Sequence, residues 1–396
     1  MTVPQNYQFP WREGNRFEVL VDGPEFFPRM LSAIDLAQHF ILLEMYLVES
    51  GEVANKFIQA LLQAANRGVK VYLLFDDYGA IGLKKADRSK LAHSNIQFVY
   101  YNPLQSYSTL YNLYKVLLRR AERILYRNHR KVLLVDGKLA FTGGLGITDE
   151  FDPPIDAETR WRETVVEIQG PVINDWIQLF TETWNQDDKK LSIKDYATPV
   201  PLVHGQLGRV TVNEIHHWRG AQRSLIRRLD SAEHRIWFAT AYFIPPWRIR
   251  RKLKRAARAG VDVRLLLPGP ITDHPSVRHA SHRFYSRLLK NGVRIFEYQP
   301  RFLHAKTVLC DNWVTIGSNN FDRWNLQWNL EANQEIEDQD IAEKVIRIFQ
   351  NDFASSVEYT FEKWHRRNWR SRLLEWFWKK VEILSMKIKK NRQNRK

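Results

Sequence analysis

Two histidine–lysine pairs are the residues of this chain best suited to catalysis. They occur in a repeated pattern, His-x-Lys-x-x-x-x-Asp, whose members are His129, Lys131, Asp136, His304, Lys306 and Asp311. Each copy overlaps a short apolar run, which predicts a strand. Because side chains two apart on a strand point the same way, the His and Lys of each copy should project together. The Asp of each candidate catalytic motif has the opposite parity, so we interpret it as a turn or support residue.

A turn of small residues and then an acidic residue follow each pair. These are Gly143-Gly144 and Glu163 in the first copy, and Gly317-Ser318-Asn319-Asn320 and Glu331 in the second. Small residues let backbone and side-chain donors approach a phosphate, so Gly144, Ser318 and Asn320 are candidate phosphate-binding residues. A carboxylate that contacts a histidine fixes its tautomer and raises its basicity, the role expected of Glu163 and Glu331.

These side chains supply what the exchange of alcohols on a phosphodiester needs. One neutral imidazole attacks phosphorus, while the other, protonated, donates to the departing alcohol and later accepts a proton from the incoming one. The lysines and an Asn or Ser donor neutralise charge that Mg²⁺ neutralises in other phosphoryl-transfer enzymes. We therefore expect no cofactor and no metal. One such motif can arise by chance. Two copies, each followed by a small-residue turn, indicate a catalytic site.

The elements that must position these residues are also duplicated. The segments 33–46 and 57–77 resemble the segments 228–242 and 249–269. Each pair predicts a buried strand, a helix that ends near Gly68 or Gly260, and another strand. This alternation predicts an α/β sandwich in each half with a largely parallel sheet. We expect two such domains, residues 1–200 and 201–360, related by pseudo-twofold symmetry.

One segment breaks the duplication. About 22 residues, roughly 104–128, precede His129 and have no counterpart before His304. Their Leu, Tyr and basic residues predict an inserted helical segment. Two roles stay open for it: a helix that covers the domain, or a lid or lipid-entry element beside the active site.

Bulk composition narrows the class of protein. A chain of 396 residues that is 44% hydrophobic can build packed cores, so disorder is not expected. The single cysteine, Cys310, excludes an intrachain disulfide and a Cys-rich metal site, and we interpret it as a buried strand residue. The start of the sequence lacks a signal-peptide pattern, and the apolar stretch 40–48 is too short to span a membrane and contains Glu44. We expect a soluble or peripheral, cytoplasmic protein.

Basic charge is concentrated near the C-terminus. Residues 363–396 contain thirteen Lys and Arg against two acidic residues, which leaves +5 of the net +16 for residues 1–362. Apolar residues at helical spacing predict a basic amphipathic helix from residue 361 on an anionic bilayer. The residues expected to contact the membrane are Trp369, Trp376, Trp378, Lys379 and Lys380. The alternative is a terminal helix docked on the protein with a solvated basic end. We interpret the other basic stretch, 248–260, as the solvated face of a helix.

At the two motifs the sequence resembles the phospholipase D superfamily, in which paired His-Lys-Asp motifs form one active site between two similar domains. Within it, the chain resembles the bacterial cardiolipin synthases of the B type, which lack N-terminal transmembrane helices. WREGNRFEVLVDG, HRKVLLVD, HAKTVLCD and GSNNFD followed by NLEAN carry the likeness, which covers nearly all of residues 11–350.

The resemblance implies transfer of a phosphatidyl group from one phosphatidylglycerol to another through a phosphohistidine, giving cardiolipin and glycerol. Phosphatidylethanolamine is an alternative donor. It also implies that His129 is the nucleophile and His304 the acid/base, an assignment that the pseudo-symmetry makes reversible. The chain departs from the family at Gly146, where the turn has no counterpart of Asn320, so backbone or Thr148 must replace that donor.

Three alternatives stay open: hydrolysis in place of transfer, a nuclease of the same superfamily, and a non-catalytic membrane-binding scaffold. Charge in the tail and 14 tryptophans favour an anionic membrane of phosphatidylglycerol and cardiolipin over nucleic acid as the partner. The expected location is the cytoplasmic face of the bacterial cell membrane, with peripheral attachment.

Overall fold

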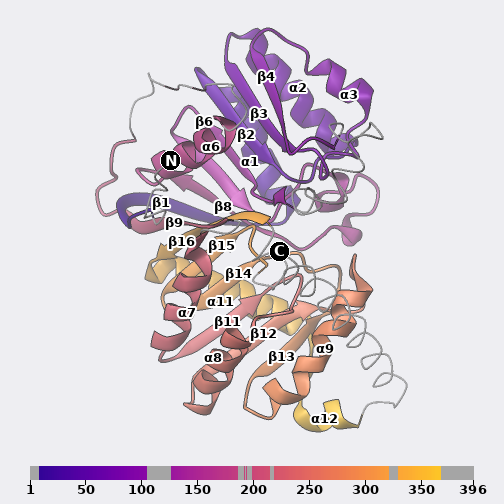
Figure 1. Cartoon of the computed structure of the whole chain (residues 1–396), viewed down its shortest axis with the longest axis vertical. Helices are drawn as coiled ribbons and strands as arrows, with labels where there is room; N and C mark the ends of the chain where they lie inside the picture. The colour runs from indigo at the N-terminus through magenta and orange to yellow at the C-terminus, as the bar shows by residue number, and fades with distance from the viewer. Residues whose placement is uncertain are drawn as a thin grey trace, which may run out of the picture.

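The computed structural model describes residues 9–104, 126–185, 191, 193, 199–214, 218–320 and 329–366. They form two similar α/β halves, which lie one above the other in Figure 1. The sheets of the two halves approach each other at the middle of the molecule, and most of the helices lie farther out. The duplicated sequence therefore folds as a duplicated structure.

The first half is a mixed sheet covered by helices. Its elements are β1 (Arg12–Val21), α1 (Gly23–Leu36), β2 (Phe40–Met45), α2 (Glu52–Asn66), β3 (Lys70–Asp76), α3 (Lys85–Lys90), β4 (Ile96–Tyr101), β5 (Arg127–Asn128), β6 (Val132–Val135), β7 (Leu139–Gly143), β8 (Thr164–Gln169) and α6 (Ile173–Trp184). The strand order is β4-β3-β2-β6-β7-β8-β1. The buried faces of α1 and α2 pack with one side of this sheet in a common apolar cluster.

The second half repeats this order. Its elements are β9 (Gln206–Glu214), β10 (Trp218–Arg219), α7 (Gly220–Ser231), β11 (Arg235–Ala239), α8 (Trp247–Arg258), β12 (Asp262–Pro268), α9 (Pro275–Leu289), β13 (Arg294–Tyr298), β14 (Thr307–Cys310), β15 (Trp313–Gly317), β16 (Asn329–Glu337), α11 (Gln339–Ala354), β17 (Ser356–Tyr359) and α12 (Phe361–His365). The strand order is β17-β13-β12-β11-β14-β15-β16-β9. Among the described strands, the edge strand β17 and the short strand β10, which pairs with β9, have no counterpart in the first half.

The prediction of largely parallel sheets is wrong. Within each sheet the described parallel pairs are β2-β3-β4 and β11-β12-β13, while the strands that follow each motif pair antiparallel with their sheet neighbours. One further short parallel pair, β5 with β16, joins the two halves. In the first half, Asp136 and Gly137 both have positive φ values, 51° and 65°, in a tight turn that reverses the chain from β6 into β7. Asp-Gly between apolar runs is a strong hairpin signal, so the sequence contained this information.

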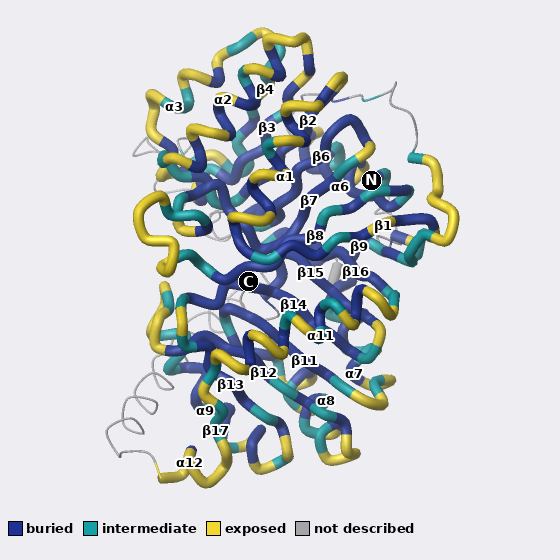
Figure 2. The backbone as a smooth tube through the Cα atoms, turned by 180° about the vertical axis from the view of Figure 1, so that it is seen from behind, coloured by how far each residue is buried: buried dark blue, intermediate teal, exposed yellow. Residues whose placement is uncertain are grey.

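One apolar core joins the halves. Val166 and Trp176 of the first half belong to the same buried cluster as Trp237 and Phe349 of the second. Strand β1 also pairs with β8 on one side and with β9 on the other, which connects the two sheets. Figure 2 shows buried backbone along the strands of both halves, with exposed positions mainly on outer helices and loops.

Several predictions fall at the limits of the described residues. Arg127 and Asn128 form β5, which pairs in parallel with β16, so the helix predicted for 104–128 is wrong at its end. Residues 105–125 lie outside the described residues, as do 367–396 with all five tail residues assigned to the membrane. Cys310 is buried in β14, as predicted. Within the described ranges, no helix is both long and apolar enough to cross a bilayer.

Candidate active site

Each motif histidine contacts a carboxylate from the opposite half of the molecule. His129 Nδ1 lies 3.0 Å from Glu331 Oε2, and His304 Nδ1 lies 2.7 Å from Glu163 Oε2. Both carboxylates are fully buried. The sequence predicted carboxylate–histidine contacts without saying which residue contacts which. The observed crossing makes each histidine depend on both halves.

The backbone repeats this crossing. The His129 amide donates to the Leu330 carbonyl at 3.0 Å, and the His304 amide donates to the Arg162 carbonyl at 2.8 Å. Each acceptor directly precedes the glutamate that contacts the same histidine. The pairing of the loop with the opposite strand therefore sets the position of each imidazole relative to its carboxylate.

The motif lysines lie beside their histidines, as strand parity predicted. Lys131 Nζ donates to the His129 carbonyl at 2.6 Å and lies 4.9 Å from the centre of the Tyr46 ring. Lys306 Nζ lies 3.0 Å from His304 Nδ1 and 3.5 Å from Glu163 Oε2, with no exposed side-chain surface. When protonated, these two buried amino groups attract an anion strongly, because water screens their charges little.

Burial sets the charge states of the site. It lowers the pKa of His129, and with the Lys306 charge it lowers the pKa of His304 well below its usual range. Burial also lowers the pKa of Lys131 to about 7 and the pKa of Lys306, and it raises that of Glu163. Both imidazoles are therefore mainly neutral at neutral pH, and Nδ1–H donation to the glutamates leaves Nε2 unprotonated. In His304 this nitrogen lies 3.1 Å from Lys306 Nζ.

The two motifs influence each other electrostatically. The Lys306 charge helps lower the pKa of His129, and the charges of Lys131 and His129 help lower the pKa of His304. Such reciprocal effects require the two half-sites to lie within a short distance in a medium of low polarity. The structure thus brings the two His-Lys pairs together as one site.

The small residues of the two turns leave room for neighbouring side chains and bond the backbone of neighbouring strands. A methyl group at Gly144 would overlap the Glu163 carboxylate and lie 2.7 Å from Lys306 Nζ, so only glycine lets these groups meet. The Ser318 hydroxyl bonds both the carbonyl and the amide of Ala332, at 3.3 Å and 3.1 Å. This hydroxyl therefore links β15 to β16, and its role as a phosphate donor stays a prediction. Asn320 is 2% exposed and its Oδ1 has no hydrogen-bond partner among the described residues.

Comparison with known proteins places this geometry in a family. The family model described as "Cardiolipin synthase, PLD-like domain" matches residues 30–184 and 225–353. The chain belongs to this family. It is 34% identical over 334 residues to cardiolipin synthase B of Salmonella typhi, covering 83% of this chain and 78% of that protein. It is 30% identical over 373 residues to a cardiolipin synthase of Geobacillus kaustophilus, covering 93% of this chain and 72% of that protein.

A solved structure confirms the fold. The crystal structure of phosphatidylserine synthase from Haemophilus influenzae superimposes with a TM-score of 0.73 at 13% identity and covers 96% of both chains. The family model and the cardiolipin synthase relatives confirm the resemblance to the phospholipase D superfamily and its cardiolipin synthases. The duplicated α/β architecture is confirmed as well.

The departure of this chain from the cardiolipin synthase pattern at Gly146 has a steric reason. A methyl group there would lie 2.9 Å from Leu47 Cβ and 3.1 Å from Leu47 Cγ, so this backbone leaves no room for an asparagine. The hydroxyl of Thr148, which we considered as a substitute donor, lies 3.0 Å from Glu49 Oε2. The first half therefore has no side-chain equivalent of Asn320 at this turn.

The motif aspartates lie outside the site, which corrects their inclusion in the catalytic motif. Each sits at the far end of its strand from the lysine, with positive φ, and its carboxylate accepts three backbone amide hydrogens. The donors are Gln38, His39 and Phe40 for Asp136, and Glu233, His234 and Arg235 for Asp311. These contacts anchor the start of β2 and β11, in keeping with the support role.

Aromatic rings around the imidazoles were missed from the sequence. The Trp161 and Phe302 rings lie 5.0 and 5.6 Å from the His304 ring, and the Tyr46 ring lies 4.6 Å from the His129 ring. They exclude water and so contribute to the desolvation that lowers both histidine pKa values. Trp161 stands two residues before Glu163, a signal that could have been used.

A buried polar network supports only the first motif. The Asn128 side chain donates to Glu44 Oε1 at 2.6 Å, and its amide donates to Asp76 Oδ2 at 2.8 Å. Burial raises the pKa of Glu44 and raises that of Asp76 to about 6. Strand register aligns these acids with Ala239 and Pro268 in the second half, which cannot take their place.

Proposed function

We propose that this chain is a cardiolipin synthase that transfers a phosphatidyl group from one phosphatidylglycerol to a second, releasing glycerol. The single observation that carries the proposal is the crossed pair of histidine–glutamate contacts, which unites both His-Lys pairs in one site. Membership of the cardiolipin synthase family supports the reaction type.

In the first step, Nε2 of a neutral imidazole attacks phosphorus. A phosphorus–nitrogen bond forms as the bond from phosphorus to the glycerol oxygen breaks. The second imidazole takes up a proton when the anionic lipid binds, because the phosphate charge raises its pKa, and it gives this proton to the leaving oxygen. Lys131 and Lys306 stabilise the charge on the phosphoryl oxygens.

In the second step, the hydroxyl of another phosphatidylglycerol gives its proton to the imidazole that acted as the acid. Its oxygen attacks phosphorus, the phosphorus–nitrogen bond breaks, and cardiolipin leaves with both imidazoles restored. Glu163 and Glu331 hold the rings in the reactive tautomer. The aromatic surroundings disfavour water as the acceptor, which supports transfer over hydrolysis.

The choice of nucleophile distinguishes the two half-sites. The family resemblance assigns attack to His129, and the pseudo-symmetry leaves His304 as the alternative. Burial lowers the pKa of both histidines, so each has the neutral form that attack requires. Labelled phosphatidylglycerol and the single variants His129→Ala and His304→Ala separate these assignments. The variant that lacks the acid/base histidine should retain a trapped phosphohistidine, and the variant that lacks the nucleophile should not.

The membrane part of the proposal places the enzyme at the cytoplasmic face of the cell membrane, attached by its basic C-terminal segment. Deletion of residues 363–396 should weaken binding to phosphatidylglycerol vesicles more than it slows turnover of detergent-dispersed substrate. Equal losses in both assays would indicate a purely structural tail.

Product analysis tests the reaction itself. Incubation with phosphatidylglycerol vesicles should yield cardiolipin and glycerol in equal amounts, measured by mass spectrometry. Mostly phosphatidic acid would identify a hydrolase. Cleaved DNA beside untouched lipid would identify a nuclease. Cells in which both histidine variants retain the role of the wild-type protein would point to a non-catalytic scaffold.

A further inference from the structure

A second concentration of basic charge lies on the outer surface of the second half. Residues 220–258 contain eleven Lys and Arg against two acidic residues. The tail carries most of the net positive charge of the chain, yet the net charge of this segment of α7, β11 and α8 exceeds the +5 that remains for residues 1–362. The rest of that region is therefore net acidic. The net positive charge of residues 1–362 is therefore concentrated in the segment 220–258.

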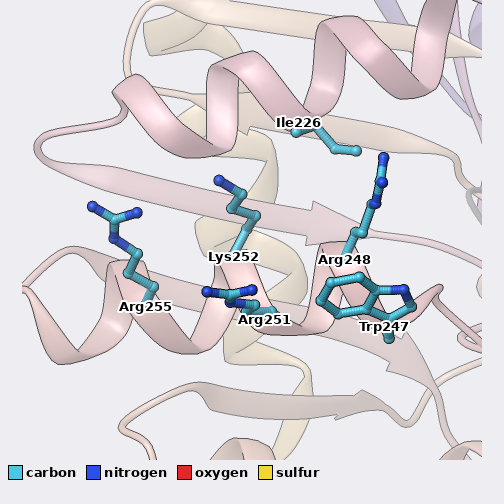
Figure 3. A pocket seen from close by; sticks show the side chains of 6 residues that line it. All are labelled: Ile226, Trp247, Arg248, Arg251, Lys252 and Arg255. Atoms are coloured by element: carbon cyan, nitrogen blue, oxygen red, sulfur yellow. The ribbon is translucent and has the colours of Figure 1, made fainter.

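This charge lines a hollow between α7 and α8 of about 330 Å³. Ile226 comes from α7, and one side of α8 supplies the remaining lining residues, which we call the α8 basic face: Trp247, Arg248, Arg251, Lys252 and Arg255. Figure 3 shows the α8 side chains standing along one side of the helix, with the Trp247 ring at its start. Trp247 is 58% exposed, and the guanidinium carbons of Arg248 and Arg251 each lie 5.9 Å from the centre of its ring.

Most of the cations on this face lack a counter-charge. Lys252 is paired with Asp230. Among the described residues, no carboxylate lies within ion-pair distance of Arg248, Arg251 or Arg255, and all three are exposed. Unpaired like charges repel one another, so folding alone does not favour this arrangement.

The matching helix of the first half shows that the arginines are not needed for packing. Helix α2 occupies the same place in the duplicated order and packs on its sheet through an apolar face, as α8 does through Ile249, Leu253 and Ala256. Its only Lys or Arg is Lys56. A solvated helix surface therefore needs far less charge than α8 carries. The basic residues of 248–258 do form the solvated face of an amphipathic helix, as predicted, and their excess charge needs a further explanation.

The α8 basic face begins at the edge of the sheet that carries the active site. Strand β11 runs antiparallel to β14, with Ala239 opposite Thr307, the residue after Lys306. The chain leaves β11 at this end and enters α8 at Trp247 after a short loop. A bilayer in contact with Trp247 would thus lie near the same edge as the His-Lys pairs.

We propose that the α8 basic face docks on an anionic phospholipid bilayer. Its guanidinium groups bind headgroup phosphates, and the Trp247 ring lies in the interfacial layer, where tryptophan is favoured. Charge complementarity and an exposed indole beside arginines select a lipid surface as the occupant. The inference deepens the proposed function, on which it rests, by assigning the surface that presents the site to its lipid.

The test uses the full chain with Arg248, Arg251 and Arg255 all changed to Glu. Each juxtamembrane cation contributes about a fivefold factor in partition, so loss of three should weaken binding to phosphatidylglycerol vesicles by about a hundredfold or more. The matched control reverses three exposed lysines of the first half, Lys56, Lys84 and Lys85, which gives the same change in net charge. The control should bind within about threefold of the unaltered protein.

Milder variants and a separate activity assay distinguish a loss of membrane binding from misfolding and from a loss of catalysis. Arg→Gln at the same three positions removes the three cations without adding anions and should weaken vesicle binding by about a hundredfold. Trp247→Ala should weaken it by about tenfold, and these milder changes guard against misfolding of the charge-reversed variant. All should turn over detergent-dispersed phosphatidylglycerol at close to the normal rate, so failure of the proposed catalysis is seen separately with His304→Ala. Vesicle binding equal to that of the control, or a loss of DNA binding with vesicle binding intact, would overturn the proposal.

Discussion

The two half-sites share a framework and differ in what surrounds it. In both, a histidine at a loop end contacts a glutamate from the other half, and a lysine two residues later lies beside it. His129 follows a strand held by buried acids, whereas His304 lies among aromatic rings with Lys306 directly against it. Duplication thus supplied equivalent positions, and local burial tuned them differently.

This difference bears on the division of catalytic labour. A chemical cycle with a nucleophile and an acid needs two imidazoles with different proton affinities. Burial lowers the pKa of both histidines. At His304 the Lys306 charge adds to the effect of burial and Asp273 opposes it, whereas at His129 Glu331 opposes burial and the Lys131 charge adds to it. Symmetric contacts with asymmetric surroundings can therefore yield two roles from one repeated motif.

The largest expected effect comes from removing either imidazole. His129→Ala and His304→Ala should each lower kcat by about 10⁴-fold or more, because each step of the cycle needs both groups. The double variant should be little slower than either single one, since residues that act as a unit are not additive. Steady-state cardiolipin formation checks this. Two independent half-sites would instead give half the wild-type rate in each single variant.

The next effect concerns the charge of Lys131, whose pKa is lowered to about 7 by burial. As pH rises through that value, the free enzyme loses this positive charge, so kcat/KM for the anionic lipid should fall by up to about a hundredfold by pH 9. Lys131→Arg keeps the charge and should remove the decline. Lys138→Arg, in the turn after β6, is the matched control and should retain it. A decline that persists with arginine would assign it to another group.

The crossed glutamates should have a smaller effect on rate. Glu163→Gln and Glu331→Gln should each lower kcat by about 10–100-fold, as for carboxylates that orient a functional histidine. Glu163→Gln should cost more, because Glu163 also faces Lys306. The controls are Glu167→Gln on β8 and Glu337→Gln on β16, whose carboxylates pair with surface arginines instead.

The Glu331→Gln variant also reports the role of His129. Glu331 raises the pKa of His129, so its loss should lower that pKa further. If His129 is the nucleophile, which must be neutral, the acidic limb of the pH profile moves to lower pH. If it is the acid, which must be protonated, the alkaline limb moves instead. An unchanged profile would show that the contact serves orientation alone.

The smallest effect on turnover is expected at the motif aspartates. Asp136→Asn and Asp311→Asn each weaken the hydrogen bonds that the carboxylate accepts from three backbone amides. Each change should therefore lower the free energy of unfolding by about 1–3 kcal/mol. Asp136 is more buried than Asp311 and should give the larger loss. Urea unfolding measures the change. A large drop in kcat of the folded variants would return the aspartates to the catalytic machinery.

Local sequence patterns predicted the parts of the site that depend on neighbours in the chain. Strand parity placed Lys131 beside His129 and Lys306 beside His304. The Asp of the motif was correctly interpreted as a turn or support residue, and the Asp136-Gly137 turn makes an antiparallel hairpin of β6 and β7. The alternation of strands and helices predicted parallel pairing there, which is wrong. The domain limits near residue 200 and the membrane helix after residue 361 stay predictions.

The repeated motifs, the duplicated order of elements and the family can all be recognised in the sequence, because each depends on residues close together in the chain. The pairing of Glu331 with His129 and of Glu163 with His304 became visible in the folded chain alone, because these contacts join residues 202 and 141 positions apart. The same holds for the Ser318 hydroxyl, which bonds the backbone of Ala332 on β16. Their partners and neighbours are fixed by the packing of strands and helices in space, which no local pattern specifies.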